Sequence, residues 1–338
     1  MQSKVFTRRG FLAAGSALPL VAIGSRRGAA AGFNYKFATG QDPTHPINIR
    51  GQQAIDRIRA ASKGRLEIKL FPANQLGSDT DLLSQVRTGG VDFLNLSTSI
   101  LATLVPAAGI PNTGFAFQDY GQVWKAMDGG LGEYIRSQIE KSGLFAFSKI
   151  QDNGFRQITT STHPIEKPDD LKGFKIRVPP APILTSLFTA LGAGPTPINF
   201  SELYSALQTK VVEGEENPLA IIATTRIYEV QKYCSMTSHV WDGYWILANR
   251  RSWRSLPEDL RTIVSQEFDK SALDEREDVA KLSQKLRQEL TTKGLQFNEV
   301  NHDNFRNALR GTNFYKEWRG RFGEKGWKLL EDAVGPLV

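Results

Sequence analysis

The sequence predicts an α/β protein of two domains that are joined by strands crossing between them. The chain has 338 residues, enough for one large or two ordinary domains. Strand-like and helix-like segments alternate from residue 35 to about residue 95, which is typical of a βαβ sheet covered by helices. A second unit of the same kind begins near Phe155, and a strand-like segment at 244–248 leads back to the first unit.

The elements of the first unit follow from the spacing of its apolar residues. A period of two predicts a strand, and a period near 3.6 predicts a helix. These spacings predict strands and helices in alternation, namely a strand at Tyr35–Thr39, a helix at Ile47–Ser62, a strand at Leu66–Phe71, a helix at Asp79–Thr88 and a strand at Val91–Asn95.

The same spacings predict the second unit. It contains two strands and two helices, the strands at 155–160 and 174–178 and the helices near 182–191 and at 200–209. Asn199 is followed three residues later by Glu202, which predicts a capping box at the start of the last of these helices. The acidic run 213–216 precedes a proline closely, so we interpret it as a turn, with a cation site as the alternative.

The C-terminal third predicts how the two domains are connected. A charged amphipathic helix at Leu260–Leu290 is followed by a strand and two closing helices, at 295–299, 302–310 and 313–333. The chain therefore enters the second domain near residue 154, leaves it near 243 and returns near 283. Several crossings are what a hinge requires. The predicted division is an export signal at 1–31, domain I at 32–153 with 243–282, and domain II at 154–242 with 283–338.

The N-terminus has the pattern of a cleavable export signal. Arg8 and Arg9 precede an apolar stretch that ends near Gly24, and Arg26, Arg27 and then the small residues Ala29–Ala31 follow. The stretch is too short to span a membrane, so we predict export to the periplasm with cleavage near Ala31. Arg26 and Arg27 behind the apolar stretch favour the twin-arginine route, with a Sec signal that carries two adjacent arginines as the alternative. This segment holds five of the seven net positive charges, so the basic pI gives no argument for nucleic-acid binding.

Motifs for catalysis are missing from the sequence. Its four histidines are scattered, and its single cysteine, Cys234, lies in a segment typical of a protein core. The sequence has no zinc, nucleotide or serine-hydrolase motif. We therefore predict no catalytic residue, no metal and no cofactor, and a binding protein rather than an enzyme.

One arginine and one asparagine predict recognition of a carboxylate. Arg177 lies on the short strand Lys175–Val178, which two prolines end. Its guanidinium fork fits a planar carboxylate with two parallel hydrogen bonds, a fit that lysine does not reproduce. Asn217 precedes Pro218, which favours an extended backbone and leaves the amide side chain available to donate. A structural ion pair is the alternative role for Arg177.

The stretch around these two residues also carries a family resemblance. Its matching segments, together with others upstream and downstream, cover roughly residues 33–330; they are Gly64–Ile68, Gln75–Gly77, Gly154–Arg156, Pro168–Gly173, Gly192-Ala193, Pro195–Pro197, Phe200, Glu202–Tyr204, Ala206–Gln208, Glu216–Pro218 and Leu256–Leu260. In this order they resemble the extracytoplasmic solute-binding subunits of TRAP (tripartite ATP-independent periplasmic) transporters.

The resemblance implies a fold, a partner and a site. The fold is the two-domain clamshell of periplasmic binding proteins, with a long helix packed across both domains. The implied partner is a separate integral-membrane permease, and the implied ligand is a small organic acid. Arg177 matches the family's carboxylate-binding arginine, Arg156 its second basic contact, Asn217 its ligand-binding asparagine and Phe200 a wall of its pocket.

Three further residues are candidates for the site. Trp241 or Asp242, in an aromatic-rich crossing segment, is predicted to face the ligand, with core packing as the alternative. His45 precedes the first helix, where the resemblance implies a ligand contact, and a loop histidine is the alternative. Dicarboxylates, sugar acids, 2-oxo acids and aromatic acids all remain open as ligands. We expect a monomer, with a secreted cofactor-dependent enzyme or a ligand-presenting partner of a sensor as alternative functions.

Overall fold

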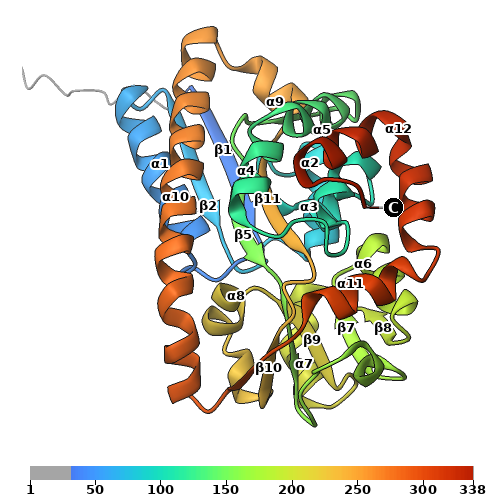
Figure 1. The fold of residues 1–338 in the computed structure, drawn as a ribbon. Helices are drawn as coiled ribbons and strands as arrows, with labels where there is room; N and C mark the ends of the chain where they lie inside the picture. The colour runs from blue at the N-terminus through green and yellow to red at the C-terminus, as the bar shows by residue number, and fades with distance from the viewer. Residues whose placement is uncertain (1–31, 338) are drawn as a thin grey trace, which may run out of the picture.

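The computed structural model describes residues 32–337, so the predicted export signal lies outside the described residues. Two six-stranded sheets lie one above the other along the molecule, each covered by its own helices (Figure 1). We call the first sheet with its helices domain I, and the second sheet with its helices domain II. The predicted α/β clamshell with crossing strands is confirmed.

The sheet of domain I has the order β2-β1-β3-β11-β4, with β5 also paired to β11. Its strands are β1 (Phe33–Thr39), β2 (Leu66–Phe71), β3 (Phe93–Ser97), β4 (Leu144–Ala146), β5 (Gln151–Phe155) and β11 (Trp241–Asn249). The strands β1, β2 and β3 run parallel, and β11 runs antiparallel to its neighbours. Every residue of β3 and β11 is buried, because helices cover both faces of this sheet.

The sheet of domain II has the order β12-β10-β6-β9-β7-β8. Its strands are β6 (Gln157–Thr160), β7 (Lys175–Val178), β8 (Gly194–Pro197), β9 (Gly214–Asn217), β10 (Tyr233–Met236) and β12 (Gln296–Glu299). The strand β7 lies between β8 and β9, parallel to both, which places Arg177 inside the sheet beside Glu215.

The helices follow the chain in the order expected for the two units, with several short ones between. They are α1 (Pro46–Ala61), α2 (Asp79–Thr88), α3 (Thr98–Leu101), η1 (Pro106–Asn112), α4 (Tyr120–Met127), α5 (Gly130–Lys141), η2 (Pro168–Leu171), α6 (Pro182–Ala190), η3 (Phe200–Glu202), α7 (Leu203–Gln208), α8 (Leu219–Thr224), η4 (Ile227–Glu229), α9 (Arg250–Ser255), α10 (Glu258–Thr292), α11 (His302–Arg310) and α12 (Phe314–Val334). Within residues 32–337 no helix is long and apolar enough to cross a bilayer.

The chain crosses between the domains four times, the last time between β12 of domain II and α12, which packs on domain I. The chain passes from β5 to β6 at Arg156 and from β10 to β11 through residues 237–240, and the backbone N–H of Arg156 donates to Val240 O at 2.8 Å where these segments meet. The helix α10 is the third connection, because it packs on α1 of domain I and on α8 of domain II. Gly243 is required beside the second crossing, since a Cβ there would lie 2.5 Å from the Trp241 ring.

The structure differs from the sequence predictions at four places. The predicted strand at 155–160 is interrupted at Arg156, because β5 of domain I ends at Phe155 and β6 of domain II begins at Gln157. Asn199 makes no side-chain cap, and the predicted helix at 200–209 begins with the 3-10 turn η3. The acidic run is not a turn, because Glu215 and Glu216 lie fully buried on β9. The predicted division assigned the chain end to domain II, but α12 packs mainly on η1, α4 and α5 of domain I (Figure 1).

Candidate ligand-binding cleft

A small cavity lies between the two domains. Its walls come from α2, β3, α3 and β11 of domain I and from β7, η3, β9 and α8 of domain II, with one crossing residue; they are Asp79, Ser97, Ser99, Ile100, Tyr244, Arg177, Pro179, Phe200, Asn217, Ile221 and Arg156. The space open to the centres of water molecules is about 20 Å³, enough for roughly one water. The cleft is therefore closed in this structure.

Arg177 is a buried cation at this cavity, and the protein compensates its charge only partly. Its side chain is 1% exposed, and its Nε and Nη2 donate to the carbonyl oxygen of Ile198 at 2.9 and 2.7 Å. Among residues 32–337 no carboxylate oxygen lies within 4.0 Å of its guanidinium nitrogens. Burial lowers the pKa of Arg177 to about 10 despite the attraction of Glu216. A carboxylate that entered the cavity would supply the missing negative charge.

Arg156 lines the same cavity but is bonded to the protein through every nitrogen of its guanidinium. Its Nε and Nη2 pair with the carboxylate of Glu216, and its Nη1 donates to Asp242 Oδ2 at 3.2 Å. Nη2 also reaches Glu216 O at 2.6 Å and Asn217 Oδ1 at 3.1 Å. Burial opposes its ionisation, yet Glu216 and Asp242 hold the pKa of Arg156 above its ordinary value. Arg156 therefore links the two domains, because Glu216 lies on β9 of domain II and Asp242 lies on β11 of domain I.

Two buried glutamates lie behind the arginines. Burial would raise the pKa of Glu216, but Arg156 and a hydrogen bond from His239 Nε2 at 3.0 Å lower it below its ordinary value. Burial raises the pKa of the neighbouring Glu215 to about 7. Thr159 Oγ1 donates to Glu215 Oε1 at 2.6 Å. The pKa values of the two glutamates are therefore shifted in opposite directions, and Glu216 is held ionised as the partner of Arg156.

Asn217 and Phe200 both line the cavity together with Arg177. The amide of Asn217 donates to Glu215 Oε2 at 2.5 Å and accepts from Arg156 Nη2, so its orientation is fixed on β9. Phe200 lies on η3 and is partly exposed. The structure brings Arg177, Arg156, Asn217 and Phe200 together around one space.

The other three candidates lie elsewhere. Trp241 faces away from the cavity: its Nε1 donates to Asp152 Oδ1 at 2.9 Å and its ring packs against Trp124. Asp242 lies behind Arg156, where its carboxylate also accepts from Ser97 and Thr98 at 2.7 Å. His45 caps α1, accepting from Ile47 N through Nδ1, and burial lowers the pKa of His45 to about 4. None of the three is among the cavity-lining residues in the described part of the chain.

The walls that domain I contributes to the cavity were not predicted from the sequence. Asp79 follows the N-cap Ser78 of α2 and is 7% exposed, while Tyr244 accepts a hydrogen bond from Gln41 Nε2 at 2.6 Å. Tyr244 could have been found, because it lies two residues beyond Asp242 on a strand, where side chains alternate between faces. Asp79 gave no such signal, since its place depends on the packing of α2 against the cleft.

The described residues contain no cluster of three or more histidine, cysteine, aspartate or glutamate side chains that could hold a metal ion. The acidic groups of the cavity are instead bonded to donors of the protein. Fold and cavity together define a two-domain binding protein with a site for a small anion in the cleft between its domains.

Comparison with known proteins identifies the family. The chain matches the bacterial extracellular solute-binding protein, family 7, over residues 37–319, and it belongs to this family. It is 31% identical over 247 residues to the 2,3-diketo-L-gulonate-binding periplasmic protein YiaO of Escherichia coli, covering 73% of this chain and 74% of that protein.

Solved structures are similar over nearly the whole described chain. A TRAP periplasmic solute-binding protein of Sulfurospirillum deleyianum with bound succinate has a TM-score of 0.85 and 27% identity, covering 90% of this chain and 99% of that one. A second, from Ralstonia eutropha with bound (S)-2-acetolactate, has a TM-score of 0.85 and 28% identity, covering 89% and 98%. These relatives are binding proteins of TRAP transporters.

Proposed function

We propose that this protein captures a small organic acid in the cleft between its domains and delivers it to a TRAP-type membrane permease. The observation that carries the proposal is Arg177, a buried guanidinium at the cavity with no carboxylate partner within the described residues. A buried unpaired charge is costly, so a carboxylate ligand at this position would gain both its own hydrogen bonds and the attraction of an uncompensated cation.

The other cavity residues have separate parts in this proposal. Asn217, held in place by Glu215 and Arg156, would offer its remaining amide hydrogen to the ligand. Phe200 would cover the ligand from the domain II side. Arg156 would hold the crossing segments in register rather than bind the ligand directly, because its nitrogens are already bonded to Glu216 and Asp242.

Ligand capture would proceed by opening and closing of the clamshell. The cavity in this structure holds about one water, so a ligand would enter an open form, and the domains would close around it less tightly than they do here. Only the closed form brings Tyr244 and Ser97 of domain I opposite Arg177 of domain II, and this difference in contacts would favour closure. Relatives with bound succinate and (S)-2-acetolactate support an acid ligand.

Location and partner follow from family membership and remain part of the proposal. YiaO is a periplasmic protein, and the matched structures are of periplasmic subunits. We propose the periplasm for this protein as well, after removal of the predicted signal at 1–31, which the structure does not describe. The permease would receive the ligand when the cleft opens against it.

A thermal-shift screen of the purified protein against organic acids tests the proposal. An acid present at a hundred times its dissociation constant stabilises the folded state by about 2.7 kcal/mol, a rise in melting temperature of a few degrees. Calorimetry on Arg177→Lys, with Lys175→Arg on the exposed start of the same strand as control, should show loss of the hit only in the first variant. Equal affinity of Arg177→Lys and the wild type would contradict the proposal.

A further inference from the structure

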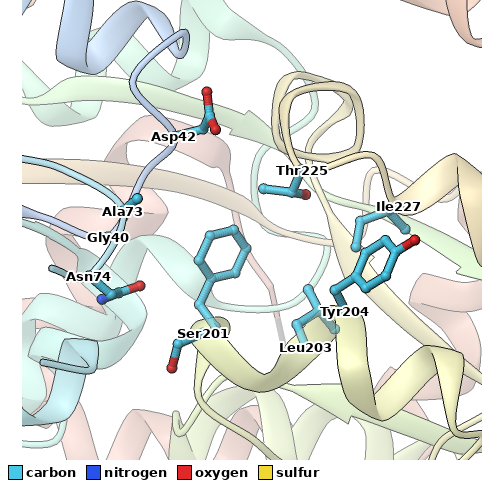
Figure 2. A pocket seen from close by; sticks show the side chains of 10 residues that line it. Gly40, Asp42, Ala73, Asn74, Ser201, Leu203, Tyr204, Thr225 and Ile227 are labelled. Carbon is cyan, nitrogen blue, oxygen red and sulfur yellow. The ribbon is translucent and has the colours of Figure 1, made fainter.

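A second chamber lies outside the inner cavity and shares its walls. It is lined by two loops of domain I, around Gly40–Asp42 and Ala73-Asn74, and by residues of η3, α7 and the α8–η4 segment of domain II. Figure 2 shows Asp42, Ala73 and Asn74 on one side of this space and Tyr204, Thr225 and Ile227 on the other. The space open to the centres of water molecules in this chamber is about 240 Å³.

Two contacts show that the chambers adjoin. Phe200 lines both of them, so its ring forms part of the partition. On the domain I side, Asn74 of the outer chamber donates through Nδ2 to Asp79 Oδ1 of the inner cavity at 3.0 Å. A Cβ on Gly40 of the outer chamber would lie only 2.4 Å from the same oxygen. The partition is therefore one side chain thick on each side.

The outer chamber differs chemically from the inner cavity. Its domain II wall is mostly apolar and aromatic, formed by Phe200, Leu203, Ile227 and the ring of Tyr204, and Ser201 and Thr225 add two hydroxyl groups to it. The Tyr204 hydroxyl donates to Glu229 Oε2 at 2.8 Å. No arginine, lysine or histidine is among its lining residues in the described chain, and it contains the carboxylate of Asp42. A second carboxylate would gain no cation there and would be repelled by Asp42.

We infer that the outer chamber is the second half of the ligand site and that the ligand is a monocarboxylic acid with an apolar or aromatic body. This rests on the proposed function: the carboxylate binds Arg177 in the inner cavity, and the body passes Phe200 into the outer chamber. The inner cavity admits about one water, whereas the outer chamber holds a ring or a chain of several carbons. Displacement of Phe200 joins the two spaces.

Calorimetry with straight-chain monocarboxylates from acetate to octanoate tests this inference. Each methylene group buried in the outer chamber should tighten binding about fourfold until the chamber is filled. Octanoate should bind at least tenfold more tightly than octanedioate, which has the same length but ends in a second carboxylate. An aromatic acid of similar length, 3-phenylpropanoate, should behave like octanoate.

A substitution that fills the outer chamber locates the effect. Ser201 is exposed and lines the outer chamber, whereas Ser205 is exposed on the next turn and does not line it. Ser201→Trp should weaken octanoate at least tenfold and leave acetate, which has no chain to place in the outer chamber, within twofold, and Ser205→Trp should change neither. Circular dichroism and melting temperature establish that both variants fold.

The outcomes separate this inference from the proposed function. Affinity that depends on Arg177 but is independent of chain length overturns the inference and leaves the proposed function standing. Equal weakening of acetate and octanoate by Ser201→Trp also overturns the inference, as does octanedioate binding as tightly as octanoate. Failure of every acid, short or long, to bind the refolded wild-type protein overturns both.

Discussion

Arg156 and Arg177 line the same cavity and are equally buried, but the protein surrounds them differently. Arg156 pairs with the carboxylates of Glu216 and Asp242. Arg177 donates to a single carbonyl oxygen, that of Ile198, and burial lowers its pKa. The charge of Arg156 is balanced within the fold, whereas that of Arg177 has no carboxylate partner among residues 32–337. Under the proposed function, this difference separates a residue that holds the domains together from a residue that binds the ligand.

The largest expected effect is on stability at Arg156. Replacing it in Arg156→Met would leave Glu216 and Asp242 buried without their cation, and loss of one partner of a buried ion pair lowers the free energy of unfolding by about 3–5 kcal/mol. Urea denaturation of the ligand-free variant measures this value. A loss below about 1 kcal/mol would remove the distinction drawn between the two arginines.

Glu275 is a buried acid that, like Arg177, has no oppositely charged partner among residues 32–337. Glu275 on α10 is fully buried; its Oε2 accepts from Asp152 N at 2.8 Å, and its Oε1 has no partner among residues 32–337. Burial and the neighbouring Asp152 raise the pKa of Glu275 well above its ordinary value. The unfolded chain ionises near the ordinary value and the folded one only at higher pH, so stability contributed by this group falls as pH rises through that window.

Glu275→Gln removes this loss while keeping an acceptor for Asp152 N. We expect the variant and the wild type to be equally stable near pH 4. Above that pH the free energy of unfolding of the variant should exceed that of the wild type by up to about 1.4 kcal/mol for each further pH unit. Denaturation at a series of pH values measures this difference. Glu277→Gln, at an exposed position on the same helix, is the matched control and should follow the wild-type profile. Parallel profiles for all three proteins would contradict the interpretation of Glu275 as an unpaired buried acid.

The stability of an Arg177 variant tests the same difference between the two arginines. Arg177→Met removes a buried charge without a carboxylate partner and leaves only Ile198 O without its donors. Removing the buried charge should stabilise the fold by about as much as the loss of the hydrogen bonds to Ile198 O destabilises it. The free energy of unfolding in the absence of ligand should therefore change by about 1 kcal/mol or less. Urea denaturation beside Arg156→Met tests this. A loss as large as that of Arg156→Met would show that Arg177 is part of the structural framework.

The smallest predicted effect concerns a contact across the cleft. Thr80 Oγ1 of domain I donates to Asn199 Oδ1 of domain II at 3.3 Å, beside Phe200. Thr80→Val keeps the shape and removes the donor, so ligand affinity should fall by about 1 kcal/mol or less, up to fivefold. Calorimetry on Thr80→Val, Asn199→Ala and the double variant should show non-additive losses; additive losses would mean that the contact does not contribute to closure.

The sequence predicted most of the fold because its strands and helices have regular apolar spacing. Leu66–Phe71 and Asp79–Thr88 were predicted at the residues where β2 and α2 begin and end. The segment Gly214–Asn217 was misjudged, since two adjacent glutamates are unusual on a buried strand. Their burial depends on Arg156, His239 and Thr159, which come from other parts of the chain. Such long-range compensation leaves no local pattern.

The site could be predicted in part for a similar reason. Arg177 could be proposed because the prolines after it end the strand at the cleft, and Asn217 because a proline follows it. Trp241 could not be separated from its neighbours: alternation along β11 fixes which residues share a face, but not which face borders the cavity. That choice depends on the packing of Trp241 against Trp124, a contact between residues more than a hundred positions apart.

The helix α10 packs on both domains and therefore constrains the angle between them. Its 35 residues form a rod about 52 Å long that lies against both α1 and α8. A helix curves only gently, so the two domains cannot swing apart without bending this rod or detaching from it. If the domains open as proposed, the elastic cost would be stored in this helix, away from any ligand atom. Substitutions in α10 would then shift the balance of open and closed forms without altering what the cleft recognises.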